Sequence, residues 1–253
     1  MLRLTRHNFV IPPLSHYKYI QIFISSYVKN SKWTIVFIHG WGTNELSLLP
    51  LAKQFENQYS YHLLSLRGFD GKDMEKEYQI SDYLDDIKLF LDNLKDENVL
   101  IVGHSFGGKL AILLKKEYPK YKVVSIAPSI VKNPFSLKIW LKIRLYKLLK
   151  KLNIKIPSYL QGSKDYRKLD GNLRKTFLNV HHAYLSFSEI KEIDDIVVLG
   201  FIEDKDVNIK SLDKAFRNSN VYYFRYKGDH FAYLNYLIEI RTIIISYIRG
   251  GLS

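Results

Sequence analysis

The chain has 253 residues, of which 47% are hydrophobic and 25% are charged, so it can bury a full core and is not intrinsically disordered. It contains no cysteine, which excludes disulfide bonds, thiolate zinc sites, iron–sulfur clusters and thiol nucleophiles. Its 38 basic and 25 acidic residues give a net charge of +13, which indicates an anionic partner such as nucleic acid, an anionic membrane or an acidic carrier protein.

The N-terminal residues lack the apolar run and small-residue cleavage site that are typical of a signal peptide. No stretch approaches the roughly 20 apolar residues that span a bilayer, because Glu239 and Arg241 interrupt the apolar run near the C-terminus. We therefore expect a cytoplasmic protein that is not integral to a membrane, and peripheral attachment to a membrane surface stays open.

Short apolar runs alternate with amphipathic stretches, a pattern typical of a mostly parallel sheet covered by helices. An antiparallel strand is expected at 19–26, and further strands are expected at 34–38, 61–65, 99–102, 123–127, 196–199 and 221–224. Helical periodicity appears at 48–55, 83–94, 110–118 and 233–248. The alternation predicts one α/β fold.

A long segment between the strands at 123–127 and 196–199 contains no convincing strand. An insertion of that length in a compact sheet protein is usually functional and often forms a lid. We therefore divide the chain into a first part of the core at 1–128, a basic helical cap at 129–193 and a second part of the core at 194–253.

The motif Gly-His-Ser-Phe-Gly at 103–107 joins an apolar strand to a helix. In the pattern G-x-S-x-G the serine occupies a strained turn that lifts its hydroxyl above the sheet, and side chains two residues to either side would collide. The motif predicts that Ser105 is a nucleophile.

The same residues also match a phosphate-binding loop from Gly103 to Lys109. That loop requires serine or threonine at the next position to hold magnesium, and Leu110 offers no oxygen. A nucleotide-binding protein is thus one alternative, and a catalytically silent binding module on the same fold is another.

A serine hydroxyl needs a neighbouring base, and His230 follows the last expected strand, where it would reach the carboxyl end of the sheet. A carboxylate must orient that imidazole, and Glu203, Asp204 and Asp206 follow the strand at 196–199. The chain order serine, acid, histidine is that of hydrolase sheets. With no cysteine and no H-E-x-x-H motif, no metal site and no cofactor are expected.

Negative charge on a reacting carbonyl oxygen needs backbone N–H donors. The turn His-Gly-Trp-Gly at 39–42 follows a strand, so the amides of Trp41 and Phe106 are the expected oxyanion pair. Candidate substrate contacts are His39, Gly40, His104 and Trp140.

Together, the turn at 39–42, the elbow at 103–108, Asp204 and the segment at 228–231 resemble the α/β-hydrolase superfamily. The resemblance implies a mostly parallel, roughly eight-stranded sheet with a helical cap after the sixth strand. It also implies a serine esterase or lipase that cleaves a carboxylic ester or thioester of an apolar acyl group through an acyl-enzyme. The segments at 162–167 and 175–177 further resemble the cap of some bacterial members.

The acid loop departs from the family pattern, which reads G-x-x-D with a proline four residues later. Alignment on Asp204 places Phe201 at the glycine and Asn208 at the proline. Counting from Gly200 makes Glu203 the acid instead. We favour Asp204 because this alignment leaves the strand unbroken.

The positive charge is concentrated at 118–164, which holds eleven lysines and arginines and no acidic residue, so the rest of the chain carries 27 basic and 25 acidic residues. Within this segment a helical stretch sets Leu137, Leu141, Leu145, Leu148 and Leu152 on one face, and Arg144, Lys147, Lys150 and Lys151 lie opposite. One interpretation is that the apolar face closes the pocket. The other is that the cap docks on anionic lipid headgroups or on an acidic acyl carrier protein. Nucleic acid is not expected, since no reader module is recognised.

Overall fold

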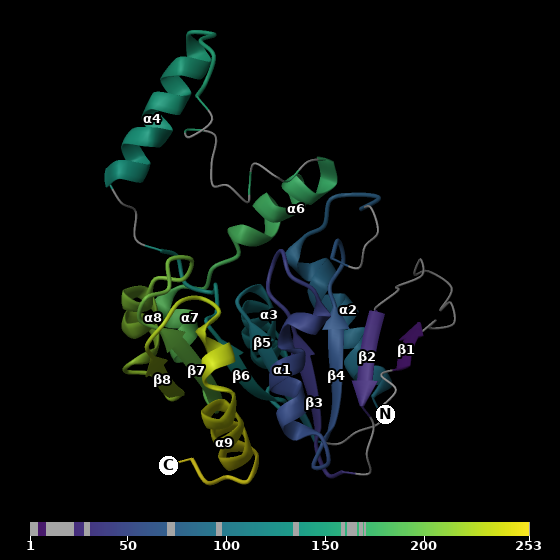
Figure 1. The fold of residues 1–253 in the computed structure, drawn as a ribbon. Coiled ribbons are helices and arrows are strands. Elements are labelled where there is room, and N and C mark those ends of the chain that lie inside the picture. The colour runs from purple at the N-terminus through teal and green to yellow at the C-terminus, as the bar shows by residue number, and fades with distance from the viewer. Residues whose placement is uncertain are drawn as a thin grey trace.

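A computed structural model describes residues 5–8, 23–27, 31–69, 74–94, 98–133, 137–157, 160, 166, 169 and 171–252 (Figure 1). The strands are β1 (Thr5–Asn8), β2 (Phe23–Tyr27), β3 (Thr34–Ile38), β4 (Ser60–Ser65), β5 (Val99–His104), β6 (Lys122–Ile126), β7 (Ile196–Phe201) and β8 (Tyr222–Tyr226). The longer helices are α2 (Ile80–Asn93), α3 (Phe106–Glu117), α4 (Leu137–Lys151), α6 (Gly171–His181), α8 (Ile209–Phe216) and α9 (Leu237–Ile248). Shorter helices are η1 (Glu45–Leu48), α1 (Leu49–Ala52), η2 (Lys53–Phe55), α7 (Phe187–Lys191) and η4 (Ala232–Asn235).

The strands form one eight-stranded sheet in the order β1-β2-β4-β3-β5-β6-β7-β8. β2 runs antiparallel to both of its neighbours, and the pairs from β4 to β8 are parallel. The expected fold class, a mostly parallel α/β-hydrolase sheet flanked by helices, is confirmed. From β3 the chain passes to β4 on one side and then crosses to β5 on the other, so the strand order reverses between β3 and β5. In sheets of this kind ligands bind outside the carboxyl ends of the strands at such a reversal.

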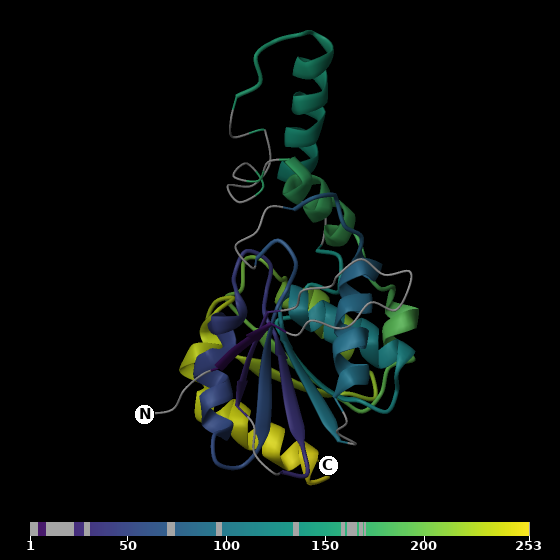
Figure 2. The same ribbon diagram turned by 90° about the vertical axis from the view of Figure 1, so that its right-hand side faces the viewer.

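Helices cover both faces of the sheet (Figure 2). On one face Ile87 of α2 and Leu110 of α3 pack in a core that also includes side chains of α7 and α8. On the other face Phe55 of η2 and Ile244 of α9 pack in a second core. Because both faces are covered, every residue of β3, β5 and β7 is buried, which explains why these strands are continuous apolar runs in the sequence.

The expected strands are found within a few residues of their predicted ends, and part of the first, at 19–22, lies outside the described residues. The expected helix at 48–55 is a succession of short turns, η1, α1 and η2, with Pro50 at the start of α1. The sequence analysis missed β1 and α8. Both are short, and neither carries a long periodic apolar pattern.

The segment between β6 and β7 contains α4, α6 and α7. α6 lies close to the sheet end, whereas α4 stands apart from the sheet and its covering helices in both views (Figures 1 and 2). The motif expected at 162–167 falls outside the described residues except for Tyr166. Within the described part of the chain, no helix combines the length and the apolar character needed to cross a membrane.

Candidate active site

Ser105 lies in the sharp turn between β5 and α3, with φ 52° and ψ −109°. A positive φ is strained for a residue with a side chain, and the surrounding hydrogen bonds hold it. The Ser105 amide donates to the Ile126 carbonyl at 2.8 Å, and the Ser105 carbonyl accepts from the Lys109 amide at 3.0 Å. Ser105 is partly exposed while its neighbours His104 and Phe106 are buried, so the turn presents the serine as the motif predicts.

The two flanking glycines of the motif allow close backbone packing. A Cβ atom added to Gly103 would lie 2.2 Å from the Gly107 carbonyl oxygen, and one added to Gly107 would lie 2.1 Å from the Ile38 carbonyl oxygen. Both obstacles are backbone atoms that cannot rotate away. The predicted collision at these positions is therefore confirmed. Because both residues are glycine, α3 packs directly against the ends of β3 and β5.

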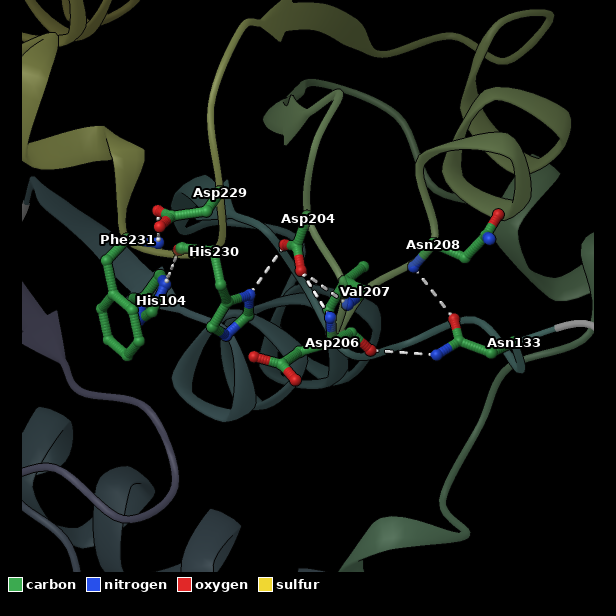
Figure 3. A network of polar contacts seen from close by, with 9 residues as sticks. All are labelled: His104, Asn133, Asp204, Asp206, Val207, Asn208, Asp229, His230 and Phe231. Carbon is green, nitrogen blue, oxygen red and sulfur yellow. Dashed lines mark hydrogen bonds and ion pairs between the residues drawn. The ribbon is translucent and has the colours of Figure 1, made fainter. Parts of the chain in front are cut away.

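His230, in the loop after β8, pairs with Asp204, in the loop after β7 (Figure 3). The His230 Nδ1 atom donates to the Asp204 Oδ2 atom at 2.7 Å. The other carboxylate oxygen accepts from the amides of Asp206 and Val207 at 2.8 and 2.9 Å. The Asp204 side chain is 1% exposed, so the carboxylate has a fixed orientation. With its proton on Nδ1, the imidazole leaves Nε2 as an acceptor.

Of the two candidate acids, Asp204 rather than Glu203 lies against the imidazole. Glu203 is exposed, and its amide donates to the Gly228 carbonyl at 2.9 Å, which ties the acid loop to the loop that carries His230. The difference arises because β7 continues to Phe201 before the chain turns.

Asn133, which follows β6, clamps the acid loop from the outside (Figure 3). Its Nδ2 donates to the Asp206 carbonyl at 2.9 Å, and its Oδ1 accepts from the Asn208 amide at 3.0 Å. These two bonds fix the backbone that in turn donates to Asp204. Sequence analysis missed this residue, because a contact across more than seventy positions leaves no local pattern.

His104 connects the elbow to the histidine loop. It is 1% exposed, its Nε2 donates to the His230 carbonyl at 2.9 Å, and its ring centroid lies 4.7 Å from that of His230. Since His104 precedes Ser105 in the chain, this bond places the loop that carries His230 beside the turn that carries Ser105. Burial lowers the pKa of His104 to about 3, so the ring is neutral.

The turn after β3 is organised around the Gly40 carbonyl. His39 Nδ1 donates to this oxygen at 2.8 Å and the Thr43 hydroxyl donates to it at 2.9 Å, while His39 Nε2 accepts from the Leu66 amide at 3.0 Å. In a trans peptide the next N–H points opposite to the carbonyl, so these bonds also orient the Trp41 N–H. A Cβ atom on Gly40 would lie 3.3 Å from the Ser105 Cβ, so this turn adjoins the serine.

The remaining expected substrate contacts are not brought together at Ser105. The side chains of His39 and His104 are buried at 0% and 1% exposure, and both hold backbone groups instead of facing the solvent. Trp140 is 39% exposed on α4, where it stacks against the Arg144 guanidinium at 4.2 Å. The leucines expected to close the pocket are exposed as well: Leu141, Leu145, Leu148 and Leu152 range from 41% to 57%.

An aromatic cluster that sequence analysis did not identify surrounds the turn at 39–42. The Trp41 ring makes edge contacts with Phe69, Phe106 and Phe177, at centroid distances of 4.9, 5.5 and 5.4 Å. Phe177 belongs to α6, so the inserted segment contributes to this cluster. The arrangement provides an apolar surface next to the serine.

Lys109, the lysine of the alternative phosphate loop, is turned into the fold. It is 1% exposed, and its Nζ donates to the carbonyls of Val180 and His181 at 3.1 and 3.4 Å, in the last turn of α6. Burial lowers its pKa to about 8. A cation at the C-terminus of a helix is stabilised by the exposed carbonyls there. Lys109 therefore anchors α6, and its charged group is not free to bind a phosphate as the nucleotide-binding interpretation requires.

Among the described residues, one group could supply three metal ligands, namely Asp204, Asp206 and His230, whose ligand atoms lie within 4.8 Å of one another. The Asp204 Oδ2 and the His230 Nδ1 already bond to each other. We therefore assign this group to the serine site and assign it no metal.

Acidification is expected to destabilise the protein through the two buried histidines. Burial lowers the pKa of His39 to about 4 and that of His104 to about 3, whereas both titrate near 6.5 when unfolded. The unfolded chain binds more protons between these values, so the free energy of unfolding falls as the pH drops below about 6.5. At about pH 4.5 each histidine removes about 2 to 3 kcal/mol.

Urea unfolding at several pH values between about 7.5 and 4.5 measures this dependence. His104→Gln is expected to reduce the slope of the free energy of unfolding against pH by the equivalent of one proton per molecule. His182→Gln, at an exposed position, is the matched control that is expected to leave this slope unchanged. A wild-type stability that stays flat across this range would contradict the assignment of neutral buried imidazoles.

Comparison with known proteins agrees with this architecture. A family model described as the alpha/beta hydrolase fold matches residues 34–154. A lipase-esterase related protein from Clostridium acetobutylicum superposes with a TM-score of 0.66 at 18% identity, covering 89% of this chain and 99% of that one. At this identity the structural similarity establishes the fold.

Curated relatives match shorter stretches. The chain is 31% identical to putative esterase/lipase 1 of Mycoplasma genitalium over 125 residues, 46% of each protein. It is 33% identical to a pimeloyl-[acyl-carrier protein] methyl ester esterase of Pseudoalteromonas atlantica over 78 residues, 30% of this chain and 29% of that protein. The matches span between 22% and 46% of the length of the first three curated relatives.

Proposed function

From the α/β-hydrolase fold of this chain, we propose that it is a serine hydrolase that cleaves a carboxylic ester or thioester of an apolar acyl group. Ser105 is the nucleophile, His230 the general base and Asp204 the residue that orients His230. No cofactor takes part in the proposed reaction. The observation that carries the proposal is the 2.7 Å bond between His230 and Asp204 beside the strained Ser105 turn.

In the proposed reaction the Ser105 Oγ attacks the acyl carbonyl carbon while the His230 Nε2 takes the hydroxyl proton. Asp204 stabilises the resulting imidazolium. The carbonyl oxygen becomes an oxyanion that accepts hydrogen bonds from the amides of Trp41 and Phe106, the latter at the N-terminus of α3. The leaving alcohol or thiol departs with the proton from His230, and water then releases the acid from the acyl-enzyme by the reverse proton transfers.

The aromatic cluster supports an apolar acyl group. Trp41, Phe69 and Phe177 surround the turn that carries one proposed oxyanion donor, so an acyl chain extending from the carbonyl would contact their rings. The curated relatives with esterase and lipase names are consistent with ester chemistry.

Hydrolysis of p-nitrophenyl esters of increasing acyl length tests the proposal. We expect kcat/KM to rise from acetate to hexanoate by about fourfold per methylene, because each buried methylene contributes about 0.8 kcal/mol. A folded protein that hydrolyses none of these esters would favour the catalytically silent alternative. A rate that does not depend on acyl length would contradict the proposed contact between the acyl chain and the aromatic cluster.

A further inference from the structure

From residue 140 to residue 157, helix α4 and the residues that follow it expose large apolar side chains to solvent. Leu141, Leu148 and Leu152 are 53%, 53% and 57% exposed. Four more apolar side chains of this segment are between 39% and 50% exposed, namely Trp140, Ile143, Leu145 and Ile154. We call residues 140–157 the α4 surface. Apolar groups gathered in this way on a protein surface mark an interaction site.

The α4 surface is also strongly basic. Six of its side chains are exposed cations: Lys142, Arg144, Lys147, Lys150, Lys151 and Lys155. The chain places no aspartate or glutamate anywhere in 118–164, so no acidic neighbour in the sequence offsets them. The rest of the chain, with 27 basic and 25 acidic residues, is nearly neutral. Most of the net positive charge of the chain thus lies in the same segment, 118–164, as the exposed leucines.

The position of α4 leaves this surface accessible. The segment leaves the sheet after the carboxyl end of β6 and returns through α6, and α4 stands beyond α6 and away from the body in both views (Figures 1 and 2). α6 is anchored to the body by Lys109, whereas the α4 side chains are exposed along the whole helix from Trp140 onward, apart from two half-buried positions. A flat partner can therefore reach α4 at the end of the molecule that lies beyond the carboxyl ends of the strands.

We propose that the α4 surface docks this protein on an anionic lipid membrane. Leu141, Leu145, Leu148 and Leu152 follow the i, i+4, i+7, i+11 spacing of one helix face and would enter the boundary between headgroups and acyl chains. The lysines extend their charged ends to the lipid phosphates while their alkyl stems stay against apolar surface. Trp140, stacked against Arg144, has the amphipathic character of residues found at membrane interfaces.

A membrane fits this surface better than an acidic protein does. An acidic protein would complement the lysines and a narrow apolar seam, but Trp140, Ile143 and Ile154 lie outside the leucine stripe and are also exposed. A bilayer interface accepts apolar side chains over a wide arc together with the cations that flank them. A second copy of the same helix would bring like charges together, which opposes self-association.

Co-sedimentation with vesicles tests the proposal. The full chain is mixed with vesicles of phosphatidylcholine alone or of phosphatidylcholine with phosphatidylglycerol, at low and at high ionic strength. We expect binding to the anionic vesicles that weakens with salt and no binding to neutral vesicles. A variant with Lys147→Gln, Lys150→Gln and Lys151→Gln is expected to bind about a hundredfold more weakly, since each cation near an anionic surface contributes about fivefold. Replacing Leu141 and Leu148 with serine is expected to weaken binding at least about tenfold.

A matched control removes the same charge elsewhere, through Lys53→Gln, Lys191→Gln and Lys210→Gln at exposed positions outside the α4 surface. It is expected to bind anionic vesicles within about threefold of the wild type. Absence of vesicle binding at low salt would overturn the proposal, as would equal loss in the control. Capture by an acidic acyl carrier protein without vesicle binding would also overturn it. Because docking does not require catalysis, Ser105→Ala is expected to bind as the wild type does, so failure here is distinguishable from failure of the proposed hydrolase activity.

Discussion

Replacing Ser105 with alanine is expected to lower kcat for a p-nitrophenyl ester by about 10⁶-fold, the scale of loss seen when the nucleophile of a serine triad is removed. No other described hydroxyl occupies a strained turn at the end of β5, next to the loop that carries His230. A small residual rate above the uncatalysed reaction is expected, because the backbone donors of Trp41 and Phe106 still polarise the carbonyl.

The control for this variant is Ser125→Ala. Ser125 lies in the neighbouring strand β6 and is 0% exposed, and its hydroxyl has no hydrogen-bond partner among the residues that the structure describes, so its loss is expected to leave kcat within about twofold. Denaturant unfolding of both variants shows whether each is folded. If a folded Ser105→Ala protein kept more than a hundredth of the wild-type kcat, another residue would be the nucleophile.

Asp204→Asn is expected to lower kcat by about 10³- to 10⁴-fold with little change in fold, because asparagine no longer holds the His230 proton on Nδ1. Glu203→Gln is the matched variant at the adjacent position, where the side chain is exposed. It is expected to change kcat by less than about threefold.

Measuring both variants under the same conditions decides between the two acids. The assignment rests on the bonds that Asp204 makes, to the imidazole through one oxygen and to two backbone amides through the other. If Glu203→Gln were the disabling change, the acid loop would have to rearrange in solution, and the clamp made by Asn133 would be open.

The sequence predicts the parts of this protein that depend on local chemistry. β3 is predicted at 34–38 and found there, because a strand buried on both faces must be apolar throughout. The elbow is predicted because only glycine fits at 103 and 107 and only a turn of that shape exposes Ser105. The oxyanion turn is predicted from the same reasoning about close approach at Gly40.

What the sequence leaves open depends on contacts between distant segments. Three carboxylates within four positions could serve His230, and only the path of the loop after β7 brings Asp204 to it. The clamp by Asn133 and the anchoring of α6 by Lys109 join residues more than seventy positions apart, which no local pattern records. His39 and His104 carry the residue type of a substrate contact, but their burial makes them supports for the backbone.

The structure also shows where the positive charge of the chain is concentrated. The net charge of +13 suggests an anionic partner for the whole protein, whereas the structure separates a nearly neutral body, built around the sheet, from an exposed basic helix. Leu141, Leu145 and Leu148 of α4 have the spacing of one helix face, as predicted, but their side chains are exposed to solvent and do not cover Ser105. The sequence pattern defines such a stripe without defining what it packs against, since a pocket and a membrane select the same residue types.

Covalent labelling with a fluorophosphonate tests the central assignment most directly, because the reagent reacts with a serine only where a base and oxyanion donors activate it. The labelled protein is digested and the modified peptide is identified by mass spectrometry. We predict that a single phosphonyl group is found on Ser105 of the wild type, and that Ser105→Ala and His230→Ala carry none. A folded wild-type protein that stays unlabelled, or that is labelled at another serine, would contradict the assignment of Ser105 as an activated nucleophile.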